Sequence, residues 1–68
     1  MFVVLEIQKS ENSLSVLHFE YTDRGTAENK YHTVLAAAAT SSVPIHSAVM
    51  LNEYGMIVKN EYYEHTAE

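Results

Sequence analysis

The sequence predicts an α+β domain with a four-stranded antiparallel sheet, formed in the chain order strand, strand, helix, strand, strand, and one helix packed on one face of that sheet. Four short runs are rich in β-branched and aromatic residues, one segment has apolar residues at helical spacing, and polar turn residues divide the strands into two hairpins. A chain of 68 residues supports one small core at best, so residues 1–68 are expected to form a single domain.

The first two strands are expected at residues 2–8 (FVVLEIQ) and 14–21 (LSVLHFEY). Both segments consist largely of residue types that favour an extended backbone. The polar residues 9–13 (KSENS) suit a hairpin loop of about five residues, which makes the two strands antiparallel neighbours.

A single helix is expected after the second strand. Its first residue is open between two positions, because both Asp23 and Thr26 can cap free backbone amides. We expect the helix to end at residues 40–42, since Pro44 disfavours a helical backbone at Val43. The apolar residues at helical spacing, which form one stripe, are Ala27, Tyr31, Val34, Leu35 and Ala38.

A second hairpin is expected from strands at residues 45–52 (IHSAVMLN) and 56–63 (MIVKNEYY). Gly55 closes the short loop between them, and glycine readily supplies the positive φ that a type I turn with a bulge needs. The polar tail at residues 64–68 is expected to fray. If the third strand lies beside the first, every neighbouring pair is antiparallel and the spatial order is 2-1-3-4.

Both faces of this sheet carry apolar residues. The first strand places Val3, Leu5 and Ile7 on one face, with Phe2 and Val4 on the other. One helix covers one face, so the other face needs a partner. We therefore expect a homo-oligomer in which this face, the Ala-rich helix surface, or both form the interface.

The run at residues 36–39 (AAAA) has two readings. Alanine favours helix and permits close packing on the sheet. The same smooth surface also suits a contact between helices of two subunits.

Composition limits the compartment and the partners. The chain has no Cys, which argues against a disulfide-stapled secreted protein, and it has neither a long apolar stretch nor the pattern of a signal peptide. We expect a cytoplasmic protein that does not enter membranes. The formal net charge of -5 leaves no basic surface for duplex nucleic acid.

No residue pattern indicates an enzyme or a cofactor. The four histidines lack the spacing of a metal-binding helix, and Ser occurs in no nucleophile motif. With glycines at positions 25 and 55 alone, no phosphate-binding glycine-rich loop can form. We expect no catalytic residue, no metal and no cofactor.

One weaker feature points to an anion. Arg24 and Lys30 lie in the first turns of the expected helix, where unpaired amides favour negative charge. Arg24 has an alternative role in pairing with Asp23 or Glu28. The candidate ligand-binding residues are Arg24, Lys30, Tyr31, His32, His46, Tyr54 and Tyr62, which combine the two cations with rings able to contact a base or ribose.

Most of the chain resembles a group of short uncharacterised proteins encoded by phages and prophages of gut Firmicutes. The resemblance rests on residues 30–39 (KYHTVLAAAA), 41–46 (SSVPIH) and 62–65 (YYEH), with similar segments at 5–8 (LEIQ) and 21–24 (YTDR). It implies a phage protein in the host cytoplasm and carries no known catalytic or binding residue.

Phage proteins without catalytic machinery often act against host defences. The leading hypothesis is a sponge that holds a nucleotide-derived immune signal in a pocket between subunits. The alternative is an acidic inhibitor of a host nuclease or CRISPR effector, because Glu53, Glu61, Glu64 and Glu68 against Lys59 give the C-terminal stretch a charge of -3. These acids also have the simpler role of keeping the protein in solution.

Overall fold

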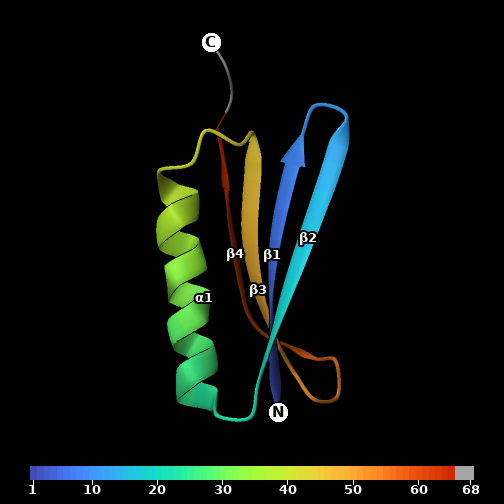
Figure 1. The fold of residues 1–68 in the computed structure, drawn as a ribbon, viewed down its shortest axis with the longest axis vertical. Helices are drawn as coiled ribbons and strands as arrows, with labels where there is room; N and C mark the ends of the chain where they lie inside the picture. The colour runs from blue at the N-terminus through green and yellow to red at the C-terminus, as the bar shows by residue number, and fades with distance from the viewer. Residues whose placement is uncertain (66–68) are drawn as a thin grey trace.

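The computed structural model describes residues 1–65 and consists of two layers, a four-stranded antiparallel sheet and one helix (Figure 1). This confirms the expected α+β class. The elements are β1 (Phe2–Ser10), β2 (Ser13–Tyr21), α1 (Arg24–Ala39), β3 (Ile45–Asn52) and β4 (Ile57–Glu64). In the described residues, no helix is long and apolar enough to cross a membrane.

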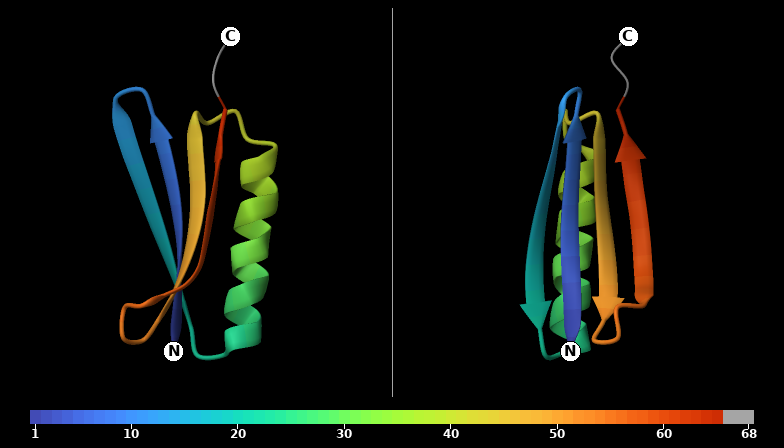
Figure 2. Two further views of the ribbon diagram at one scale, coloured as in Figure 1. Left: turned by 180° about the vertical axis from the view of Figure 1, so that it is seen from behind. Right: turned by 90° about the vertical axis from the view of Figure 1, so that its right-hand side faces the viewer.

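The strands lie in the spatial order β2-β1-β3-β4, and all three neighbouring pairs are antiparallel. Figure 2 shows α1 running along one face of the sheet, while no helix or strand within residues 1–65 covers the opposite face. We call this uncovered side the open face.

The β1–β2 hairpin has a shorter turn than the expected five-residue loop. Pairing continues to Ser10 and Ser13, so two residues, Glu11 and Asn12, make the turn. The hydroxyl oxygens of Ser10 and Ser13 lie 2.6 Å apart and form a hydrogen bond that closes it. The polar run was wrongly taken as loop because its ends pair across the hairpin.

The helix begins after Asp23, whose extended backbone and side-chain acceptor make it the N-cap. Asp23 Oδ2 accepts from the backbone amide of Thr26 at 2.9 Å and from its hydroxyl at 3.0 Å. The alternative start at Thr26 is therefore wrong, because Thr26 lies inside the first turn. Thr40 caps the other end, and its amide reaches the carbonyl of Ala37 at 3.3 Å.

The core lies between α1 and the two central strands. The expected apolar stripe is confirmed: Ala27, Tyr31, Val34 and Ala38 are buried, and Leu35 packs against them. From the sheet, Val4 and Met50 are the largest fully buried side chains. In the Ala run, Ala38 alone is buried, so the other three alanines are exposed on α1.

The β3–β4 hairpin turns at Gly55, whose φ of 79° confirms the expected positive value. Asn52 Oδ1 accepts from the amides of Tyr54 at 2.9 Å and Met56 at 3.0 Å, which orders the loop. β4 runs from Ile57 to Glu64, one residue later than expected. Glu64 therefore belongs to β4 and not to a frayed tail, whereas residues 66–68 lie outside the described part of the chain.

Candidate functional site

A groove of about 440 Å³ lies where the end of β2 meets the first turns of α1. Polar and apolar atoms line it in about equal parts, and it opens widely to solvent. The lining residues are Tyr21, Asp23, Gly25, Thr26, Asn29, Lys30 and Thr33. Because all of them come from one short stretch of chain, the groove is formed within a single subunit.

Lys30 supplies the positive charge of the groove. Its Nζ lies 4.0 Å from the centre of the Phe19 ring, so the ring face holds the ammonium group in place. Within residues 1–65, no carboxylate forms an ion pair with it. The Lys30 charge is therefore free to meet an anion.

The helix N-terminus itself is already occupied by a carboxylate. The backbone amide of Thr26, and next its hydroxyl, hold the pKa of Asp23 below its ordinary value by binding the charged form. Asp23 thus takes the place that an anionic ligand would need at these amides. An anion in the groove has to rely on Lys30 instead.

Arg24 does not line the groove. Its Nε lies 3.2 Å from Glu28 Oε2, and Lys59 Nζ lies 3.3 Å from the same oxygen. Arg24 first, and Lys59 second, lower the pKa of Glu28. The alternative role of Arg24, pairing with Glu28, is the one that the structure shows.

Apart from the neighbouring rings of Tyr31 and His32, the aromatic candidates lie in separate parts of the fold. Tyr31 is buried at 4 % exposure, and this burial, followed by the nearby charge of Glu61, raises the pKa of its phenol. His32 is exposed next to it on α1, with ring centres 5.4 Å apart. Tyr54 is 80 % exposed in the β3–β4 turn. Tyr62 pairs with Ser47 and lies on the open face.

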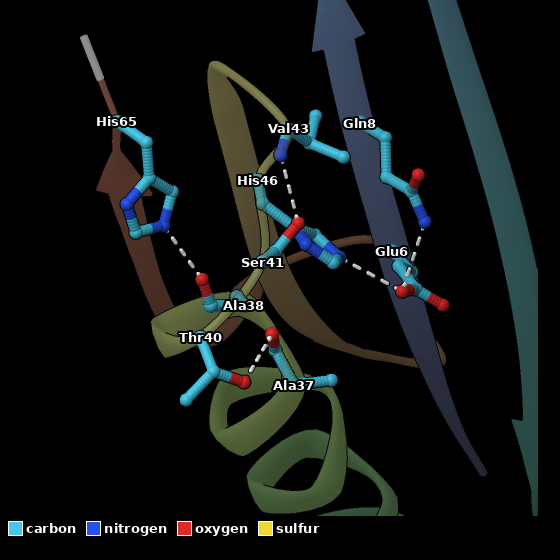
Figure 3. A network of polar contacts seen from close by, with 9 residues as sticks. All are labelled: Glu6, Gln8, Ala37, Ala38, Thr40, Ser41, Val43, His46 and His65. Atoms are coloured by element: carbon cyan, nitrogen blue, oxygen red, sulfur yellow. Dashed lines mark hydrogen bonds and ion pairs between the residues drawn. The ribbon is translucent and has the colours of Figure 1, made fainter. Parts of the chain in front are cut away.

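His46 lies between the sheet and the C-terminal half of α1 (Figure 3). It is 4 % exposed, and its Nε2 lies 2.8 Å from Glu6 Oε2. Gln8 Nε2 donates to the same Glu6 oxygen at 3.2 Å. The other ring nitrogen of His46, Nδ1, has no hydrogen-bond partner in the described part of the chain. His46 is thus buried in the helix–sheet interface and lies outside the groove.

His65 fixes the end of α1 to the end of β4. Its Nε2 lies 2.8 Å from the carbonyl oxygen of Ala38, which can only accept, so Nε2 carries the proton (Figure 3). Its backbone amide donates to the carbonyl of Pro44 at 2.7 Å. Over residues 1–65, no three potential metal ligands come together.

The acids of the C-terminal stretch point in different directions. Glu53 pairs with the N-terminal amine of Met1 at 2.9 Å. Glu61 pairs with buried Ala48 and so faces α1, whereas Glu64 pairs with Ile45 and belongs to the open face. These three acids do not form one surface, and Glu68 lies outside the described residues.

Of the seven residues expected to bind a ligand, the structure places Lys30 in the groove and disperses the other six. Sequence reasoning missed the lining residues Tyr21, Asn29 and Thr33. Asn29 and Thr33 are polar positions at helical spacing to Thr26, a signal that was available in the sequence.

Comparison of the chain with protein-family models, with curated proteins and with solved structures gives no match.

Proposed function

We propose that the protein is a non-enzymatic phage counter-defence protein that sequesters a nucleotide-derived signal, with a phosphate of that signal bound in the groove beside α1. The observation that carries the proposal is the Lys30 ammonium group, which lies in an open groove without a carboxylate partner among residues 1–65. The phage setting comes from the resemblance to short phage proteins.

The groove offers polar groups around the ammonium group. A lysine binds phosphate as a point charge, and it needs neighbouring hydrogen-bond groups to orient the ligand. The Thr26 hydroxyl already donates to Asp23 and the Thr33 hydroxyl to the carbonyl of Asn29, so both are held at the groove wall and offer acceptor lone pairs there. The Asn29 amide and the Tyr21 phenol add polar groups for a sugar or base edge.

Binding without turnover fits the chemistry of the groove. A hydrolytic site needs a nucleophile or an activated water beside a general base. The groove contains Asp23, which is committed to capping α1, and it contains no histidine. The His46–Glu6 pair is buried on the other half of the helix–sheet interface.

The acidic-inhibitor alternative has less support. Mimicry of a nucleic acid needs acids gathered on one surface. Glu53, Glu61 and Glu64 face three different surroundings, and Glu53 is neutralised by the N-terminus.

Calorimetric titration with a panel of cyclic and ADP-ribose-derived nucleotides tests the proposal. We expect at least one member to bind, and we expect Lys30→Met to lower its affinity by about tenfold or more, because the ammonium group over the Phe19 ring is lost while a side chain of similar length is kept. The matched control is Arg24→Met, which should leave affinity unchanged because Arg24 lies outside the groove.

Two results would contradict the proposal: no heat with any nucleotide of the panel, or an equal loss of affinity in both variants. Sequestration is checked separately by heating the complex and recovering the nucleotide by chromatography. An intact nucleotide agrees with sequestration, and a hydrolysed one identifies an enzyme.

A further inference from the structure

The open face carries an apolar centre. On the two central strands the residues that point away from α1 are all aliphatic except at Lys9 and Ser47. The aliphatic ones are Val3, Leu5 and Ile7 on β1 and Ile45, Val49 and Leu51 on β3. Val3 faces Leu51 and Leu5 faces Val49 across the β1–β3 pairing, whereas Ile7 faces Ser47 and Ile45 faces Lys9. Figure 2 shows no helix or strand of the described chain over this face of β1 and β3.

This apolar area continues onto both edge strands. Val16 on β2 is 51 % exposed, and Ile57 and Tyr62 on β4 are 62 % and 59 % exposed. Leu14 on β2 is also on this face and 62 % exposed, and the polar groups at the edges are His18 and Glu20 on β2 and Asn60 and Glu64 on β4. An apolar centre with a polar rim is the arrangement of a protein interface.

The dimensions of the open face fit a second sheet. Strands of 8 or 9 residues at about 3.3 Å per residue, spaced about 4.8 Å apart, give a face of roughly 27 by 19 Å. Two such faces in contact bury about 1,000 Å² in total. This area meets the lower limit for a specific protein–protein interface.

Charge placement indicates how two copies would be arranged. Lys9 pairs with Ile45, which pairs with Glu64, so Lys9 and Glu64 lie in one row across the open face. A two-fold axis that runs parallel to the strands, between β1 and β3, places β1 of one copy over β3 of the other. Each row of paired residues in one copy then lies over the same row in the second copy. Lys9 then lies within one strand spacing of Glu64 of the second copy, whereas an axis across the strands places Lys9 over Val3.

We propose that the open face binds a second copy of this chain, sheet against sheet, with the two-fold axis along the strands. Leu5 then packs on Val49 of the second copy, and two Lys9–Glu64 ion pairs close one end of the interface. The helices and the grooves lie on the outside, so this assembly does not depend on nucleotide binding.

Sedimentation velocity at about 1 to 100 µM tests whether the open face is the interface. Wild type should form a dimer, and Leu5→Lys should dissociate it, raising the dissociation constant by about tenfold or more, because a buried charge replaces an aliphatic contact. The matched control is Leu17→Lys, since Leu17 pairs with Glu6 on the opposite face and is 47 % exposed. This control should leave the dimer unchanged.

Leu5 lies on a central strand, so circular dichroism has to show that the variant folds. If it does not, Val16→Lys on the edge strand makes the same test, because lysine is tolerated on edge strands. A wild-type monomer at 100 µM overturns the proposal, and so does a dimer that both Leu5→Lys and Val16→Lys leave intact. A protein partner or a ligand would then be the occupant.

Charge reversal tests the axis. Lys9→Glu alone and Glu64→Lys alone should each weaken the dimer by about threefold or more, since each places like charges together at the rim. The double variant Lys9→Glu/Glu64→Lys should restore the wild-type dissociation constant to within about twofold. Additive weakening in the double variant would overturn the proposed arrangement.

Discussion

At the scale of single residues, the polar contacts at the helix–sheet interface are the feature that could not be predicted from the sequence. Glu6 and Gln8 continue the same strand face as Phe2 and Val4, and His46 continues that of Met50. The partner of His46 is 40 positions away in the chain, so the strand register, and not local pattern, brings them together. His46 was expected to contact a ligand, and the structure buries it against Glu6, outside the groove.

The His46–Glu6 hydrogen bond predicts strong energetic coupling. Replacing one partner leaves the other as a buried polar group without a hydrogen bond, whereas replacing both leaves no polar group that needs one. We expect His46→Leu and Glu6→Leu each to lower the free energy of unfolding by about 1–3 kcal/mol, and the double variant to lose clearly less than the sum. Urea unfolding measures all four states of the cycle.

The comparison pair is Arg24→Met with Glu28→Gln, because this ion pair is exposed. The changes in the free energy of unfolding caused by these two substitutions should nearly add in the double variant. Simple additivity at His46 and Glu6 as well would mean that their contact contributes nothing specific.

At the scale of elements, the helix and the turn between β3 and β4 were predictable because their signals are local. The apolar stripe and the φ of Gly55 follow from residue types at fixed spacing. The choice between Asp23 and Thr26 was not predictable, since both residues cap well. The structure resolves it because the Thr26 hydroxyl and amide both donate to Asp23.

The Asp23 cap predicts a dependence of stability on acid. Because the pKa of Asp23 is lowered in the folded protein, its contribution is present above the unfolded value of about 3.9 and is lost as pH falls through the folded value. Asp23→Asn keeps an acceptor but no titration, so it should melt close to wild type at pH 7 and lose less stability between pH 4 and pH 2. Asp23→Ala should melt lower at every pH.

Thermal melts followed by circular dichroism across this pH range make the measurement. The pKa of Glu28 is lowered as well, so the Asp23→Asn variant should keep part of the acid sensitivity. An equal loss of stability in acid for wild type and Asp23→Asn would show that protonation of Asp23 does not affect the stability of the fold.

At the scale of the whole molecule, the limiting quantity is the size of the core. Seven apolar residues are buried within residues 1–65, and three of them are alanines. The sequence indicated a small core and two apolar sheet faces, because alternation shows which residues share a face. It did not indicate that the interface under the C-terminal half of α1 is polar, since this depends on the register between β1 and β3.

This small core predicts that one side chain decides whether the chain folds. A core in a domain of this size rarely supplies more than about 3–5 kcal/mol, and truncating a buried methionine to alanine costs about 2–5 kcal/mol. Met50 is fully buried against α1 and Val4, whereas Met56 is 63 % exposed in the hairpin loop. Met50→Ala should therefore remove most of the cooperative thermal transition at 25 °C and above, and Met56→Ala should change the free energy of unfolding by less than about 0.5 kcal/mol.

Circular dichroism melts at one fixed protein concentration compare the two variants, because association with a second copy would raise the transition temperature of either one. A Met50→Ala melt within about 2 °C of wild type would show that contacts outside this core hold the fold together.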